Sequence, residues 1–199
     1  MLELRKRLQA AEEEQREQTK KRNKLLYQSE HDELTGLYNK RSLNRYLEDV
    51  FEACKLNEKE LGILFLDIDY FKQLNDRYGH GKGDEGICAV ADTLKKIFPE
   101  DYVARYGGDE FLVVMTGRDL TYVMEHAESL CAGIREYKIP NEDSELEPWL
   151  TISVGGVCAI PREPNRVWDF LSAADNTLYE QKKEQKGKVR FYQGEGKYL

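Results

Sequence analysis

The sequence predicts one α/β (α+β) domain, a mixed five-stranded sheet flanked by helices, preceded by an N-terminal helix. Short apolar runs of strand length alternate with segments whose apolar residues recur at helical spacing. From residue 61 onward these segments follow the order β-α-α-β-β-α-β-α-β, which is typical of a mixed sheet covered by helices. The chain has 199 residues, which is enough for one domain with a substantial core and too few for two large ones.

Local patterns predict each element. Residues 1–30 contain no Gly or Pro and are rich in strong helix formers. Apolar residues at helical spacing predict helices starting near Asn39 and over 71–78, 87–97, 120–134 and 170–178. Strands are predicted at 61–66, 103–106, 111–115, 150–160 and 189–192. Gly107-Gly108 is predicted to form a two-residue hairpin turn, because that turn requires positive φ. We therefore divide the chain into an N-terminal helical linker, residues 1–30, and a domain, residues 31–199.

The N-terminal segment has two interpretations. A 4/3 repeat carries apolar residues at its start and end and polar residues in its middle: Leu4, Leu8, Ala11, Gln15, Gln18, Arg22 and Leu25. This is a weak heptad seam, which predicts a coiled coil between two copies. A solvated helix or frayed tail explains the composition equally well. Because the chain begins inside a helical pattern, we expect it to be part of a longer parent protein.

Composition excludes several functional classes. The net charge of −7 argues against a nucleic-acid-binding protein, which needs a basic surface. No apolar run approaches the roughly 20 residues of a membrane span, and no signal-peptide pattern follows the N-terminus. The four cysteines are scattered without a C-x-x-C pair, which argues against a zinc site or disulfide framework. We expect a soluble intracellular protein without membrane contact.

Two acidic motifs indicate phosphate chemistry. Asp67 and Asp69 end the apolar strand at 61–66, and strand alternation places them on one face. Taken alone, they could be ordinary strand-end acids. Asp109 and Glu110 follow Gly107-Gly108 side by side, although a plain hairpin has no need of adjacent acids. Oxygen ligands of this kind suit Mg²⁺, and an acidic domain can accept a triphosphate only if a metal offsets the repulsion.

These motifs, with three others in order, resemble a known family. The five segments are 32–41 (DELTGLYNKR), 66–76 (LDIDYFKQLND), 79–84 (GHGKGD), 107–111 (GGDEF) and 174–182 (ADNTLYEQK). Over residues 31–193 the chain resembles a GGDEF domain, the domain of the diguanylate cyclase family. The resemblance implies a polymerase-palm-like sheet, which agrees with the predicted order of elements.

The resemblance also implies a GTP site with Mg²⁺ or Mn²⁺ as cofactor. Asp67, the Ile68 carbonyl and Asp109 would bind the metal. Glu110 would activate the ribose 3′-hydroxyl or bind a second metal, and the sequence leaves open which acid is the base. Asp109 and Glu110 are thus the candidate catalytic residues.

The remaining implied roles concern the nucleotide. Asn75 and Asp84 would hydrogen-bond the guanine edge, because an ionised Asp accepts from both guanine N1–H and N2–H₂. His80 would lie beside the nucleotide, or be a structural residue at a helix end. Backbone N–H groups around Tyr70, Phe71 and Lys72 would cradle phosphates at a helix start. Lys72 and Lys182 would neutralise these phosphates.

The sequence departs from the family pattern at two places. Lys186 stands where the family has an arginine, so a point charge replaces a bidentate phosphate contact. We expect weaker triphosphate binding, without its loss. Many members carry an R-x-x-D product-binding motif before the hairpin, whereas this chain has Phe98-Pro99-Glu100-Asp101. Without the arginine we expect no inhibitory product site, and these residues simply end a helix and start a strand.

The resemblance therefore implies a diguanylate cyclase, a nucleotidyltransferase that condenses two GTP into cyclic di-GMP as a homodimer. It would be the cytoplasmic part of a bacterial signalling protein with an upstream sensory domain. The alternative is a non-catalytic GTP-binding regulatory module. Members of that kind usually have a damaged acidic motif, while Asp67, Asp109 and Glu110 are all present here.

Overall fold

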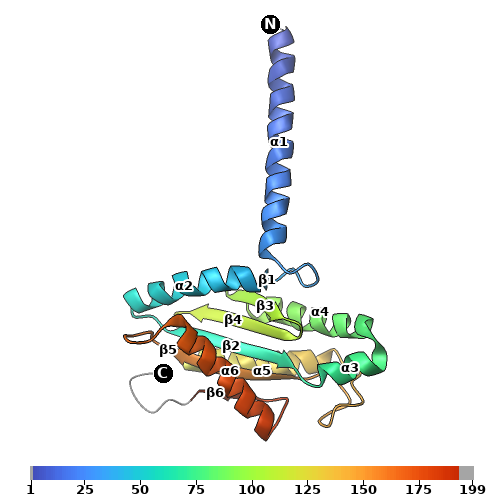
Figure 1. Cartoon of the computed structure of the whole chain (residues 1–199), viewed down its shortest axis with the longest axis vertical. Coiled ribbons are helices and arrows are strands. Elements are labelled where there is room, and N and C mark those ends of the chain that lie inside the picture. The colour runs from blue at the N-terminus through green and yellow to red at the C-terminus, as the bar shows by residue number, and fades with distance from the viewer. Residues whose placement is uncertain (1, 193–199) are drawn as a thin grey trace.

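A computed structural model describes residues 2–192, which form one mixed sheet flanked by helices and a long N-terminal helix (Figure 1). In chain order the elements are α1 (Leu2–Glu30), β1 (Tyr38–Asn39), α2 (Lys40–Leu56), β2 (Leu61–Ile68), α3 (Phe71–Tyr78), α4 (His80–Ile97), β3 (Tyr102–Gly107), β4 (Glu110–Thr116), α5 (Leu120–Glu136), β5 (Ile152–Ala159), α6 (Val167–Glu184) and β6 (Val189–Phe191). The predicted fold class and the predicted order from residue 61 onward are confirmed.

The sheet has six strands, in the order β1-β3-β4-β2-β5-β6. Central β2 is antiparallel to both β4 and β5, while β1 and β6 pair in parallel at the two edges. The prediction of five strands was wrong because β1 is only two residues long. A segment of that length has no alternation from which a strand could be predicted.

The hairpin turn lies one residue later than predicted. Gly107 pairs with Glu110, so the two turn residues are Gly108 and Asp109. Gly108 supplies the positive φ, at +30°. The register between β3 and β4 shifts after Arg105, which is a β-bulge that the sequence pattern did not reveal. The shift makes Asp109 part of the turn and Glu110 the first residue of β4.

Each face of the sheet is covered by its own hydrophobic core. Leu64 and Leu66 of β2 belong to the core beneath α3, α4 and α5. Ile63 and Phe65 belong to the core beneath α2 and α6. Burying a side chain of this size contributes roughly 1.5–3 kcal/mol. Packing in the two cores therefore holds β2 in place between the two layers of helices.

Helix α6 lies unusually close to the sheet. A Cβ at Gly155 of β5 would overlap the α6 backbone at Ala174 and Leu178. Glycine is therefore required at this position. The close approach brings the last turns of α6 near the end of β2, where Lys182 reaches Asp67.

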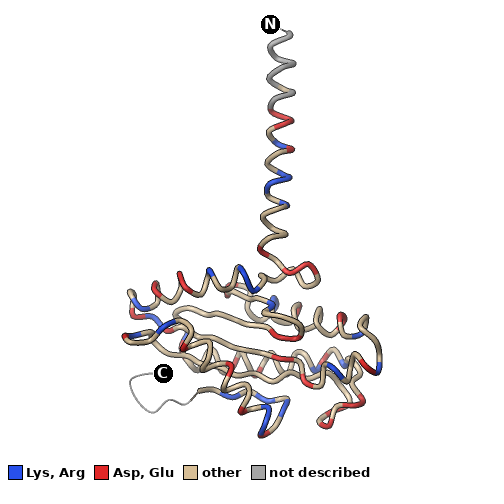
Figure 2. Tube along the Cα trace, viewed as in Figure 1, with Lys and Arg blue, Asp and Glu red and all other residues tan. Residues whose placement is uncertain are grey.

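Helix α1 projects away from the sheet domain (Figure 1) and carries charged residues of both signs (Figure 2). Its described apolar side chains, those of Leu25, Leu26 and Tyr27, are more than half exposed. The side chains of Leu4, Leu8 and Ala11, which form part of the predicted seam, lie outside the described part of the structure. None of the helices within residues 2–192 is both long and apolar enough to cross a membrane.

A continuous stack of five rings joins α1 to the domain. It runs from Tyr27 through His31, Tyr38 and Tyr102 to Tyr46, with ring centroids 4.0, 4.5, 4.2 and 3.9 Å apart. Stacked aromatic pairs of this kind contribute about 0.5–1.5 kcal/mol each beyond their burial. The stack therefore connects the end of α1 to β1, β3 and α2.

Candidate active site

Four predicted site residues meet where β2 ends beside the β3–β4 hairpin. Asp67 on β2 is directly opposite Glu110 on β4. The Ile68 backbone N–H donates to the Asp109 carbonyl at 3.3 Å. The pairing of β2 with β4 thus brings together Asp67, Ile68, Asp109 and Glu110, which are about 40 residues apart in sequence.

Burial and crowding of charge disfavour ionisation at this end of the sheet. Burial raises the pKa of Asp67 to about 6 despite the opposing effect of the Lys182 ammonium, and the charges of Asp109 and Asp69 add to the increase. The pKa of Glu110 is also raised, first by burial and then by Asp109 and Asp175. Clustered carboxylates of this kind favour the arrival of a cation.

Lys182 supplies a positive charge beside Asp67 in this cluster. Its ammonium forms an ion pair with Asp67, and both side chains are mostly buried. The sequence had placed Lys182 against phosphates and did not predict this pair. Because Lys182 lies next to Asp67, a phosphate bound at the cluster would also lie within reach of its flexible side chain.

The donor set suits a hard divalent cation. Within the described residues, no three Asp, Glu, His or Cys side chains converge on a preformed metal site. Mg²⁺ does not require one, because it usually binds one or two carboxylates plus waters and substrate phosphates. Two carboxylates and a backbone carbonyl, with raised pKa values among the acids, fit this mode of binding.

Arg105 holds the hairpin and was not assigned a role from the sequence. Its Nε and one terminal nitrogen donate to the Gly108 carbonyl at 3.0 and 2.7 Å. The other nitrogen contacts both carboxylate oxygens of Asp32, at 3.1 and 3.2 Å. Arg105 therefore ties the turn that carries Asp109 to the segment after α1. No local sequence pattern signals this role, because Asp32 lies 73 positions away.

The predicted base-binding residues lie where α3 meets α4. Asn75 Oδ1 is buried, and no donor among the described residues reaches it. A Cβ at Gly83 would overlap this oxygen, so a larger residue there would displace the Asn75 side chain. Asp84 is exposed next to Gly83, and His80 is exposed at the start of α4. A buried oxygen without a donor, close to an exposed carboxylate, suits a ligand edge rich in N–H groups.

The start of α3 provides backbone donors. Tyr70 precedes the helix in the left-handed conformation, with φ of +55°, and no side chain caps the helix. The first backbone N–H groups, including those of Phe71 and Lys72, have no acceptor within the helix. The Lys186 ammonium lies 3.8 Å above the ring of Tyr70. Phe71, Lys72 and Lys186 are therefore brought to the same end of α3.

The segment in place of the R-x-x-D motif has a structural role. Phe98 is 1% exposed and caps α4 at its C-terminal end. Asp101 is half-buried, and burial raises its pKa despite opposing effects of Arg118 and His126. The buried ring of Phe98 provides neither charge nor donor to a ligand.

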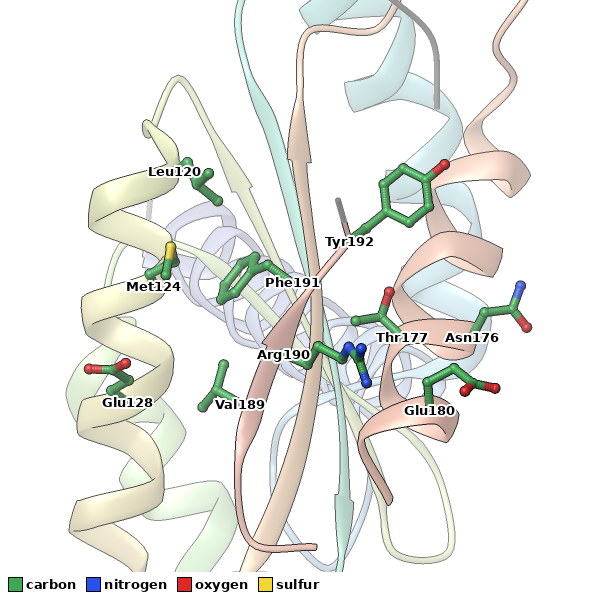
Figure 3. A pocket seen from close by; sticks show the side chains of 10 residues that line it. All are labelled: Leu120, Met124, Glu128, Asn176, Thr177, Glu180, Val189, Arg190, Phe191 and Tyr192. Atoms are coloured by element: carbon green, nitrogen blue, oxygen red, sulfur yellow. The ribbon is translucent and has the colours of Figure 1, made fainter. Parts of the chain in front are cut away.

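A cavity of about 610 Å³ lies elsewhere, where β6 stands between α5 and α6 (Figure 3). Its lining consists of Leu120, Met124, Glu128, Asn176, Thr177, Glu180, Val189, Arg190, Phe191 and Tyr192. None of these is a predicted site residue. The chemistry-bearing side chains therefore lie at the end of β2, apart from this volume.

Comparison with known proteins agrees with this geometry. The family model "Diguanylate cyclase, GGDEF domain" matches residues 29–188. The chain is 31% identical over 164 residues to the probable diguanylate cyclase DgcC of Escherichia coli K12, covering 81% of this chain and 43% of that protein. It is 32% identical over 175 residues to diguanylate cyclase DgcM of the same organism, covering 87% and 41%. The chain thus spans less than half the length of these relatives.

Solved structures show the same fold. The coiled coil and GGDEF domain of DgcB from Caulobacter crescentus, solved with c-di-GMP, aligns with a TM-score of 0.83 at 24% identity, covering 94% of this chain and 98% of that one. Diguanylate cyclase SiaD from Pseudomonas aeruginosa, solved with its activator SiaC, aligns with a TM-score of 0.71 at 27% identity, covering 95% and 73%. From the acidic end of β2, the hairpin and these matches, we conclude that the chain belongs to the GGDEF-domain family of diguanylate cyclases, which are nucleotidyltransferases.

Proposed function

We propose that the chain is an active diguanylate cyclase domain, which condenses two GTP into cyclic di-GMP and releases two pyrophosphates. The observation that carries this proposal is the convergence of Asp67, Asp109 and Glu110 at the paired ends of β2 and β4. A domain that only bound nucleotide would have no need to keep three acids together at a site where the charge of Asp109 raises the pKa of both Asp67 and Glu110.

The acidic cluster supplies the reaction chemistry. The family depends on a divalent metal, and here Asp67, the Ile68 carbonyl and Asp109 would hold Mg²⁺ or Mn²⁺. When bound, the metal neutralises phosphate charge as the new bond forms. Glu110, whose pKa is raised by burial and by Asp109, accepts the proton of the ribose 3′-hydroxyl or holds a second metal.

The α3–α4 region supplies recognition. Asn75 and Asp84 bind the guanine edge, because together they present acceptors to the N1–H and N2–H₂ groups. His80 lies beside the nucleotide. The backbone at Phe71 and Lys72 receives phosphates.

Lysine side chains complete the phosphate site. Lys72 and Lys182 neutralise the triphosphate. Lys186 adds a point charge where the family has an arginine. Because Phe98 offers no guanidinium, the domain has no inhibitory product site between Phe98 and Asp101.

Two copies must cooperate in this reaction. Each domain presents one GTP, and each 3′-hydroxyl attacks the α-phosphate of the other nucleotide, so the active form is a homodimer. We assign residues 1–30 to a helical linker that pairs two copies and connects an upstream sensory domain to the catalytic domain, residues 31–199. The projection of α1 from the domain supports this assignment (Figure 1). Because its substrate GTP is cytoplasmic, we place the domain in the bacterial cytoplasm.

Product analysis tests the proposal. The full chain is incubated with GTP and MgCl₂, and the nucleotides are separated by chromatography. We expect one cyclic di-GMP and two pyrophosphates for every two GTP consumed, and a fall in product on the order of 100-fold or more for Asp109→Asn. Binding of GTP without any product would contradict the proposal and identify the chain as a non-catalytic GTP-binding module.

A further inference from the structure

Asp69 lies two residues beyond Asp67 but in a different environment. It is 1% exposed, and its carboxylate accepts hydrogen bonds from Thr151 Oγ1 at 2.9 Å and from Ser153 Oγ at 2.7 Å. Its backbone N–H donates to the Thr151 carbonyl at 2.9 Å, and its carbonyl accepts from Asn141 Nδ2 at 3.3 Å. Both backbone and side chain of Asp69 are thus fixed by the start of β5 and the loop before it.

Ser153 connects Asp69 to a second segment. It is fully buried on β5, and its hydroxyl accepts the backbone N–H of Gly187 at 3.0 Å while donating to Asp69. A serine hydroxyl has one donor and two acceptor positions, so both bonds form together. Gly187 has φ of +74°, and its carbonyl accepts from Arg135 at 2.9 Å. The turn between α6 and β6 is therefore held from both sides of Gly187.

The two segments joined by Ser153 are those that carry the phosphate-binding groups. Tyr70 follows Asp69 and directly precedes α3, whose first N–H groups have no side-chain cap and no acceptor within the helix. Lys186 precedes Gly187 and lies over the Tyr70 ring at 3.8 Å. The buried hydroxyl of Ser153 thus links the start of α3 to the turn that carries Lys186.

We infer that Ser153 is a positioning residue for the triphosphate, which sets Lys186 against the first turn of α3 through its bonds to Asp69 and Gly187. The inference rests on the proposed function, because it assumes that these groups receive the phosphates of GTP. Ser153 does not itself touch the nucleotide. Its loss should weaken contacts to the phosphates while leaving contacts to the base unchanged.

The first test is Ser153→Ala in the full chain, with binding of GTP and of guanosine measured by calorimetry. The substitution removes only the hydroxyl. We expect the Kd for GTP to rise about three- to tenfold, the range that one hydrogen bond supports, and the Kd for guanosine to stay the same. Ser42→Ala is the matched control, since Ser42 is also buried but its hydroxyl has no partner among the described residues.

A double-mutant cycle distinguishes positioning from general loosening of the domain. If Ser153 acts through Lys186, then Ser153→Ala should change the GTP affinity of the Lys186→Met variant much less than that of the unmodified chain. Full additivity, or equal weakening of GTP and guanosine, would overturn the inference. If Ser153→Ala does not fold, Arg135→Lys replaces it, because Arg135 holds the same glycine from a part-buried position. It should show the same selective loss for GTP, and unchanged GTP binding by that variant would refute the inference.

These outcomes separate the inference from the proposed function. No GTP binding by the unmodified chain would contradict the proposed function. If the unmodified chain binds and turns over GTP and Ser153→Ala does so equally well, only the role of Ser153 is refuted, and the proposed function stands.

Discussion

Carboxylates behave differently at the end of β2 and at the joint between α1 and the domain. At the end of β2, burial and neighbouring acids raise the pKa values of Asp67 and Glu110. At the joint, burial would raise the pKa of Asp32, but hydrogen bonds from Thr35 and the charge of Arg105 outweigh it and hold that pKa below its usual range. The ionised carboxylate is thus disfavoured by its surroundings at the end of β2 and favoured by its hydrogen-bond donors at Asp32.

This difference indicates what each region does. A carboxylate that already has its donors, such as Asp32, stabilises the folded chain in its ionised form. Carboxylates that repel one another contribute little to stability and gain most from a cation that arrives with the substrate. Substitutions at the end of β2 should therefore affect activity, and substitutions at the joint should affect stability.

The largest expected effect is that of Asp109→Asn. Cyclic di-GMP formation should fall on the order of 100-fold or more, as when one electrostatic group of an active site is removed. The free energy of unfolding should change by less than about 1 kcal/mol, because the substitution also removes a like charge near Asp67. Initial rates measure the loss of product formation, and urea unfolding measures the change in stability. Asp49→Asn, at an exposed position on α2, serves as the control, and near-normal activity of Asp109→Asn would refute the metal assignment.

Asp84→Ser should have a smaller and more specific effect. The side chain loses an ionised acceptor opposite two guanine donors, a contact that supports discrimination of about 1–3 kcal/mol. The ratio of Kd values for ATP and GTP should therefore fall about tenfold or more. Asp92→Ser, also exposed on α4, should leave the ratio unchanged. If Asp84→Ser kept the full preference for GTP, Asp84 would lie outside the base site.

Asp32→Asn tests the other region. It weakens contacts to Thr35 and Arg105 and should lower the free energy of unfolding by about 1–2 kcal/mol at pH 7. Because the folded-state pKa of Asp32 lies below its ordinary 3.8, this stabilisation is present above about pH 4 and is lost as the pH falls through the folded-state pKa. Urea unfolding of both proteins between pH 3 and 7 measures the difference. If the difference in free energy of unfolding between the two proteins stayed constant from pH 3 to 7, the ionised carboxylate of Asp32 would not be the stabilising group.

Deletion of residues 1–28 should have the smallest effect on the site itself. Isolated helices of this composition are marginal in water, so pairing through α1 should be weak, and activity should rise steeply with protein concentration. The deletion should lower activity at low concentration and leave GTP affinity unchanged. Specific activity against concentration for both chains is the measurement. Identical curves would show that α1 makes no contribution to pairing.

The elements with strong local patterns could be predicted from sequence. The apolar run of β2 and the helical spacing in α2 and α5 placed these elements to within a few residues. The spacing also located α4 and α6 but made both too short, because α4 already begins at His80 and α6 continues to Glu184. The two-residue β1 is too short to show alternation. The bulge after Arg105 lies at the end of β3, where too few residues follow for a change of alternation to be seen. Both are set by pairing with strands distant in sequence.

The acidic motifs predicted which residues would meet at the site but not what supports them. Arg105 contacts Asp32 across 73 positions, and Ser153 contacts Asp69 across 84. Such contacts depend on the packed sheet and leave no local pattern. From the sequence, Asp67 and Asp69 were interpreted as a pair on one face of the strand. In the structure Asp69 accepts hydrogen bonds from two hydroxyl groups, whereas Asp67 forms an ion pair with Lys182.

The most direct test compares these two aspartates in one experiment. Asp67→Asn and Asp69→Asn are each assayed for cyclic di-GMP formation and for the free energy of unfolding. Our account predicts that Asp67→Asn abolishes product with stability unchanged within about 1 kcal/mol. It predicts that Asp69→Asn loses about 1–3 kcal/mol of stability, because a buried hydrogen-bond network is disturbed, and still forms product. Near-normal cyclic di-GMP formation by Asp67→Asn would contradict the central claim that the acidic end of β2 is the catalytic site.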